Sequence, residues 1–142
     1  MSFNPSLDVP VLDHPPDKVG GPESTGLVGY TFFYTYPTGL SYKISFDEKT
    51  AYFTLPPGAL AVDGRSFLGV PYRCRELRPD LFLAHWMVPG RQGHVALVFD
   101  LANNRVDCAA LMPGLFEPFG RTSLSKIWRN GENAIQITEG QK

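Results

Sequence analysis

Cysteine, charge and long apolar runs are all scarce in this sequence, and each shortage excludes a class of protein. The 142 residues include only two cysteines, Cys74 and Cys108, which are too few for a disulfide scaffold. Charged residues make up 19% of the chain and the net charge is −1, so the concentrated basic field that binds nucleic acid is missing. No stretch reaches the roughly 18 consecutive apolar residues of a membrane span.

The common signatures of targeting, cofactor binding and metal binding are missing as well. The opening residues, MSFNPSLDVP, lack the positive and apolar regions of a secretory signal. No P-loop, dinucleotide fingerprint or G-x-S-x-G motif is present. No spacing of His, Cys and Asp resembles a metal site. We therefore expect a cytoplasmic protein with free thiols, no cofactor, no metal, and neither a membrane nor a nucleic acid as partner.

What the chain has in quantity is aromatic residues and turn formers. Aromatic side chains make up 13% of it, with 14 glycines and 13 prolines, a composition that favours many short strands over long helices. Alternation of apolar and polar residues predicts strands over 30–36, 41–46, 50–55, 72–77, 81–88, 94–101 and 106–112. Residues 122–128 and 134–138 are further candidate strands, although a short helix near 115–127 is an open alternative. Residues 58–71 are expected to form a connection between strands.

These strands predict an all-β fold, an antiparallel up-and-down barrel, because closure removes exposed sheet edges and often encloses a ligand. Residues 1–25 contain scattered prolines and no sustained period, so we expect an extended N-terminal arm followed by a single domain over 26–142. In the first predicted strand, Phe32, Tyr34 and Tyr36 share one face.

A family resemblance rests on these residues. Residues 29–42, G-Y-T-F-F-Y-T-Y-P-T-G-L-S-Y, and the Gly64-Arg65 step resemble the first hairpin and the glycine–arginine step of bacterial phenolic acid decarboxylases. Residues 65–86 and 95–113 are similar to that family without gaps. The decarboxylases are lipocalin-like calycin barrels. The MoaF family, associated with molybdenum-cofactor genes, has a similar barrel, and the 72–86 run resembles it.

The resemblance implies a site. Tyr34, Tyr36, Tyr42 and Arg65 fall where the decarboxylases keep their substrate-binding and catalytic groups, so they are expected to hold a carboxylate or another oxyanion of an organic substrate. The resemblance also implies a homodimer. The remaining substrate-binding residues expected inside the barrel are Phe32, Tyr72, Trp86 and Val88.

Val88 departs from the family pattern. The decarboxylases keep an essential glutamate two residues after the tryptophan, and here that position is valine, which cannot move a proton. Glu76 is the candidate replacement: if the face it shares with Tyr72 and Cys74 points inward, desolvation would raise its pKa toward the range of a general acid or base. The alternative places Glu76 near a strand end, paired with a surface arginine.

These residues favour a cofactor-independent enzyme, a lyase or an isomerase/cyclase of secondary metabolism, acting on a phenolic, polyketide-like or other unsaturated carbonyl substrate. One alternative is a non-catalytic, lipocalin-like barrel that binds a small molecule. Another is a phenolic acid decarboxylase with a relocated acid. A purely structural module is the weakest reading, because it leaves Arg65 and the tyrosines without a task.

Overall fold

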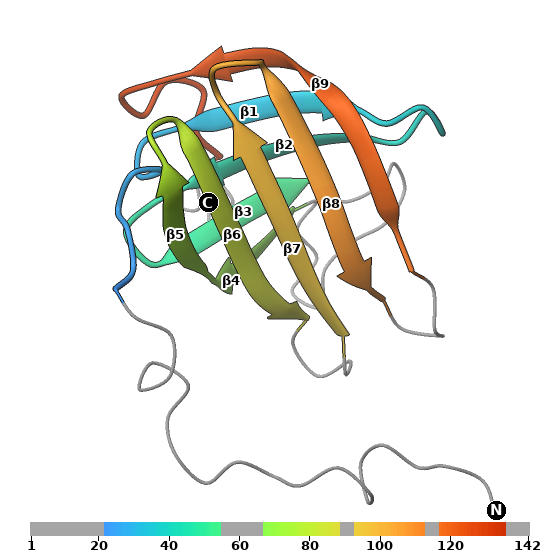
Figure 1. Ribbon diagram of the computed structural model, residues 1–142, viewed down its shortest axis with the longest axis horizontal. Coiled ribbons are helices and arrows are strands. Elements are labelled where there is room, and N and C mark those ends of the chain that lie inside the picture. Colours follow the sequence, from blue (N-terminus) through green and yellow to red (C-terminus); the bar gives the residue numbers. More distant parts are fainter. Residues whose placement is uncertain (1–21, 55–66, 89–92, 113–116, 136–142) are drawn as a thin grey trace, which may run out of the picture.

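Short strands joined by tight turns make up nearly all of the regular structure (Figure 1). The computed structural model describes residues 22–54, 67–88, 93–112 and 117–135. Its strands are β1 (Thr31–Thr35), β2 (Ser41–Phe46), β3 (Thr50–Thr54), β4 (Phe67–Pro71), β5 (Arg73–Arg78), β6 (Leu81–Val88), β7 (Gly93–Asp100), β8 (Arg105–Leu111) and β9 (Phe119–Trp128). No helix in these described ranges is long and apolar enough to cross a membrane.

The strands form one antiparallel sheet in the order β4-β3-β2-β1-β9-β8-β7-β6-β5. Chain neighbours pair throughout except β4 with β5, and the β1–β9 pair joins the first strand to the last. The sheet curls round until β4 lies near β6, which makes a nearly closed up-and-down barrel and confirms the predicted fold class. At the β4–β5 corner, Pro71 has no N–H to donate, and the Tyr72 N–H donates instead to the Lys49 carbonyl at 3.1 Å.

One sequence expectation about secondary structure is wrong, and the open alternative of a short helix has no support in the described residues. Residues 67–71 form β4 rather than a connection, because Gly69 and Pro71 hide the strand signal. A side chain at Gly69 would come within 2.8 Å of the Tyr52 ring on β3, so this position packs as glycine. Within 115–127 the described residues contain no helix, since β9 begins at Phe119. Ala134 and Ile135 lie outside any strand, and the rest of 134–138 falls outside the described residues.

The end of the predicted N-terminal arm is attached to β5. The Ser24 N–H donates to the Cys74 carbonyl at 2.8 Å, and Arg73 forms an ion pair with Glu23 at 3.0 Å. The chain then turns, and Leu27, which is fully buried, packs into the core. Residues 22–25 therefore belong with the barrel, while residues 1–21 lie outside the described part.

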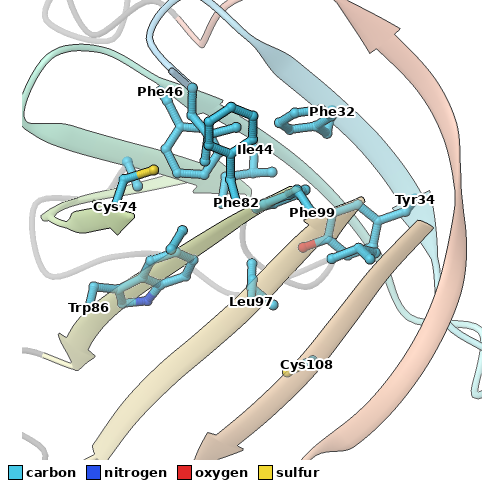
Figure 2. Packing of buried hydrophobic residues seen from close by; sticks show 14 of the residues in the cluster. Phe32, Tyr34, Ile44, Phe46, Cys74, Phe82, Trp86, Leu97, Phe99 and Cys108 are labelled. Carbon is cyan, nitrogen blue, oxygen red and sulfur yellow. The ribbon is translucent and has the colours of Figure 1, made fainter. Parts of the chain in front are cut away.

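The barrel interior contains a cluster of phenyl rings that pack in stacked and edge-to-face arrangements. We call Phe32, Phe46 and Phe99 the phenyl cluster. The ring centroids of Phe32 and Phe99 are 4.4 Å apart, and those of Phe46 and Phe99 are 5.7 Å apart. All three side chains are buried, and Figure 2 shows them on the same side of the interior as Ile44 and Phe82. Burial of this much aromatic surface is the main stabilising contribution of the core.

Candidate functional site

Three tyrosines from β1 and β2 converge beside the phenyl cluster. Tyr34 on β1 is the direct cross-strand partner of Tyr42 on β2, and Tyr36 follows the end of β1. The ring centroids of Tyr34 and Tyr36 are 5.5 Å apart, and each lies 6.0 Å from that of Tyr42. We call these three residues the tyrosine cluster. Strand alternation predicted the shared face of Tyr34 and Tyr36, and the β1–β2 register brings Tyr42 to it.

The opposite wall brings Cys108 into this cluster. Cys108 on β8 pairs with Gly120 on β9, and a Cβ on Gly120 would lie 3.4 Å from the Tyr36 ring. The Tyr36 hydroxyl lies within interaction distance of the Cys108 thiol and of the Tyr34 hydroxyl, and its single proton can be donated to one of them at a time. The cluster thus brings hydroxyl and thiol groups together, with the Tyr36 hydroxyl between the Tyr34 hydroxyl and the Cys108 thiol.

Burial controls the protonation of the network. Desolvation raises the pKa of Tyr34, Tyr36 and Tyr42 above the ordinary phenol value, and a charge on Cys108 or on a neighbouring tyrosine would raise it further. Desolvation likewise raises the pKa of the Cys108 thiol, although the hydrogen bond from Tyr36 opposes the shift. At neutral pH all four groups keep their protons, so the cluster offers hydrogen-bond donors and carries no negative charge.

The Tyr34 hydroxyl is the donor best placed for a ligand. Its side chain is buried, with 3% exposed, and points into the barrel interior (Figure 2). A hydroxyl has one proton and two lone pairs. When Tyr36 donates to the Tyr34 oxygen, Tyr34 keeps its own proton for an acceptor on a ligand.

Trp86 on β6 supplies another buried donor. Its ring stacks on Phe53, with centroids 5.6 Å apart and planes 18° from parallel. The side chain is 5% exposed, and the indole N–H has no hydrogen-bond acceptor in the described part of the protein. A buried donor without an acceptor is costly, so an acceptor atom on a ligand would be stabilising here.

The other predicted site residues are distributed differently. Phe32 belongs to the phenyl cluster rather than to the tyrosine cluster. Tyr72 packs its ring on Phe46, with centroids 4.9 Å apart, and donates its hydroxyl proton to the Asp47 carbonyl at 2.7 Å. Tyr72 therefore holds the β4–β5 corner. Arg65 lies outside the described residues. The backbone of Val88 pairs with Gly93, while its side chain also lies outside the described part.

Of the two alternatives for Glu76, the structure shows the exposed position near a strand end, and the inward-facing carboxylate is not found. The Cys74 side chain on the same strand is buried, but that of Glu76 is exposed. A register shift between Glu76 and Arg78 ends the regular pairing of β5 with β6, and this irregularity turns the strand end out of the barrel. Glu76 instead lines an open surface pocket with residues 22–25 and Arg75.

Cys108 and Gly120 are the residues that sequence reasoning missed. The sequence predicts only that Cys108 is a small buried hydrophobic residue. It predicts nothing specific for Gly120, which follows a segment without a clear apolar pattern. Only the β8–β9 register shows that the two positions face Tyr36. No group of three or more His, Cys, Asp or Glu side chains within the described ranges could hold a metal ion.

With this geometry in hand, comparison with known proteins identifies the family. The model of the MoaF N-terminal domain matches residues 17–111. The chain belongs to the MoaF family. A crystal structure from Burkholderia vietnamiensis, provisionally described as a beta-lactamase, is similar with a TM-score of 0.58 and 18% identity. The match covers 72% of this chain and 94% of that one, and at such low identity it supports the fold alone. No curated protein matches.

Proposed function

We propose that this MoaF-family barrel is a cofactor-independent enzyme, a lyase or an isomerase/cyclase, acting on a phenolic, polyketide-like or other unsaturated carbonyl compound. The observation that carries the proposal is the convergence of the Tyr34, Tyr36 and Tyr42 rings at one place in the barrel, with the Tyr36 hydroxyl beside that of Tyr34. Hydroxyl groups brought together in an apolar interior recognise an oxygen atom of a ligand, since the surrounding rings bind its hydrocarbon part.

The chemistry of the network suits the stabilisation of an oxyanion. With Tyr36 as the donor to Tyr34 in this scheme, the Tyr34 hydroxyl is polarised and becomes a stronger donor. Tyr34 then donates to a carbonyl or phenolate oxygen of the substrate. Fixed donors in a water-poor site are worth more than in water when negative charge develops on that oxygen. The Trp86 indole N–H, which has no acceptor in the described part of the protein, can donate to a second acceptor atom on the ligand.

Proton transfer falls to a tyrosine in this scheme. Glu76 is exposed, so the proposal of a decarboxylase with Glu76 as its relocated acid loses its support. Protonated phenols with raised pKa act as acids toward a strongly basic carbanion or enolate intermediate. Arg65 enters the proposal through the family resemblance, as a planar fork for a carboxylate or enolate oxygen.

A non-catalytic barrel that binds or carries a small molecule is the second candidate. One observation favours it: the tyrosine cluster and Cys108 are all protonated donors, and no carboxylate lies among them. Binding an oxygen needs only donors, whereas most proton-transfer reactions also need a base.

The experiment that separates the two candidates uses p-hydroxycinnamate as a probe of binding and of turnover. Tyr34→Phe and Arg65→Ala are compared with Tyr52→Phe, a matched control whose hydroxyl bonds to Asp47 outside the tyrosine cluster. An enzyme of the proposed kind converts the probe or a related unsaturated carbonyl compound, and Tyr34→Phe lowers its rate by about 100-fold. Binding with no product from any such compound would favour the carrier, and unchanged turnover in both site variants would contradict the proposal.

Val88→Glu gives an independent check on the resemblance. Restoring the family's acid is expected to produce measurable decarboxylation of p-hydroxycinnamate, detected by the loss of its ultraviolet absorbance. Val88→Gln is the matched control, because glutamine has the size of glutamate but no acidic group. Complete inactivity of the glutamate variant in a folded protein would show that the binding surface differs from that of the decarboxylases.

A further inference from the structure

Tyr36 lies just beyond the regular part of β1, so the strand alone does not fix its side chain. Its backbone closes the turn to β2, where the Tyr36 N–H donates to the Leu40 carbonyl at 2.9 Å and the Gly39 N–H donates to the Tyr36 carbonyl at 2.8 Å. The Tyr36 side chain is partly exposed. Something other than the β1–β2 ladder must hold the ring across the interior.

We propose that Gly120 and Cys108 are positioning residues for the Tyr36 hydroxyl. Gly120 gives the ring a flat surface on which to lie, and the Cys108 thiol contacts the hydroxyl and holds it beside Tyr34. This inference rests on the proposed function, because the hydroxyl is positioned to polarise the ligand-binding Tyr34.

The argument for Gly120 is one of space. Cδ1 and Cε1 of the Tyr36 ring lie 3.4 Å from where a Cβ on Gly120 would be. Gly120 does not have the positive φ of Gly29, Gly39 and Gly131, so its backbone would accept any residue. Glycine inside a strand weakens it and commonly marks a close approach by another group. Here the Tyr36 ring packs on the Gly120 backbone, and a methyl group added at Gly120 would touch the ring at van der Waals distance.

The argument for Cys108 is one of register and partners. It stands directly opposite Gly120 on the neighbouring strand, so a ring lying over Gly120 brings its hydroxyl to the Cys108 sulfur. Cys108 is 8% exposed, and its thiol lies close enough to the Tyr36 hydroxyl to interact with it. Cys74 is the natural comparison, because it is also a buried free cysteine, but it lies on β5 among Leu27 and Glu23 rather than at the tyrosine cluster.

A ligand-free measurement tests the positioning directly. In protein labelled with ¹³C at tyrosine Cζ, the Tyr36 resonance is assigned by its loss in Tyr36→Phe. We expect that resonance to move in Gly120→Ala and in Cys108→Ala, to return toward its original position in Cys108→Ser, and to stay in place in Cys74→Ala. A Tyr36 resonance that is unmoved in both Gly120→Ala and Cys108→Ala would overturn the proposal.

A binding cycle tests the consequence for the site. For p-hydroxycinnamate, Cys108→Ala is expected to raise Kd by about fivefold, the effect of one neutral hydrogen bond, while Cys74→Ala leaves it unchanged. In a Tyr36→Phe background the same Cys108→Ala change should have no further effect, because the two residues act together. If the losses of affinity caused by Cys108→Ala and Tyr36→Phe simply add in the double variant, Cys108 has a merely structural role and the inference is contradicted.

The two measurements separate the inference from the function on which it rests. If the wild-type protein binds no probe while the Tyr36 resonance moves as expected, the choice of substrate class fails and the positioning holds. If the probe binds and Tyr34→Phe weakens it, while the Tyr36 resonance ignores Gly120 and Cys108, the proposed function holds and the positioning fails.

Discussion

The phenyl cluster and the tyrosine cluster both take residues from β1 and β2, and they differ chiefly in the hydroxyl group. Phe32 on β1 faces Ile44 on β2, and two residues further along Tyr34 faces Tyr42. The phenyl rings pack as close as 4.4 Å between centroids, whereas the tyrosine rings are 5.5 to 6.0 Å apart. One cluster contains only hydrocarbon, and the other contains a network of protonated donors.

This difference separates stability from function along a single strand. Hydrocarbon packing stabilises the barrel without any requirement for a partner. Buried hydroxyls add little net stability, since each must first lose its bonds to water. We therefore expect substitutions in the phenyl cluster to act on the free energy of unfolding, and hydroxyl deletions in the tyrosine cluster to act on ligand binding.

The largest effect on stability is expected from Phe99→Ala. Phe99 is fully buried and touches both Phe32 and Phe46, so its loss should lower the free energy of unfolding by about 3–5 kcal/mol. Urea denaturation measures this change in the free energy of unfolding. Phe119→Ala is the matched control, because Phe119 is 85% exposed, and its change should stay within about 0.5 kcal/mol. A loss below about 1 kcal/mol for Phe99→Ala would mean that the phenyl cluster is not the stabilising part.

An intermediate loss of stability is expected at alkaline pH. Burial raises the pKa of the Cys74 thiol from 9.0 to about 11, and it also raises the pKa of the tyrosine cluster. The unfolded chain loses these protons first as the pH rises. The stabilising contribution is therefore complete below about pH 9 and declines as the pH rises toward the folded values.

Urea midpoints at neutral pH and at about pH 10.5 would show this decline. Tyr34→Phe should reduce it, because the variant removes one of the groups that ionise earlier in the unfolded chain. A midpoint that does not change over this range would contradict the burial of these groups.

A smaller effect is expected from Tyr72→Phe. The substitution removes the 2.7 Å hydrogen bond from the Tyr72 hydroxyl to the Asp47 carbonyl and keeps the ring on Phe46. The free energy of unfolding should fall by about 1 kcal/mol, measured by urea denaturation, while binding of p-hydroxycinnamate stays unchanged. Loss of binding with stability intact would return Tyr72 to the ligand site that the family resemblance implied.

Alternation made the fold and the shared face of the tyrosines predictable. The run Ser41–Phe46 alternates cleanly and forms β2. In β4 the signal is hidden, because Gly69 leaves room for the Tyr52 ring and Pro71 ends the strand. Alternation likewise placed Glu76 on the inner face, but it carries no information about the register shift that turns the end of β5 outward.

The contribution of Cys108 and Gly120 could not be read from the sequence. Both are small residues without a distinctive pattern, and they meet Tyr36 only because β9 lies between β1 and β8. That arrangement depends on pairing between the first and last strands, which is a long-range contact with no local signal.

The most direct test of the account is calorimetric titration of p-hydroxycinnamate into the wild-type protein, Tyr34→Phe and Tyr52→Phe, with urea denaturation of each. The account predicts that Tyr34→Phe weakens binding by about tenfold, the effect of one hydrogen bond to a charged oxygen. It also predicts that the stability of this variant stays within about 1 kcal/mol of wild type and that Tyr52→Phe binds normally. Equal affinity in Tyr34→Phe and wild type would contradict the claim that the tyrosine cluster holds the ligand.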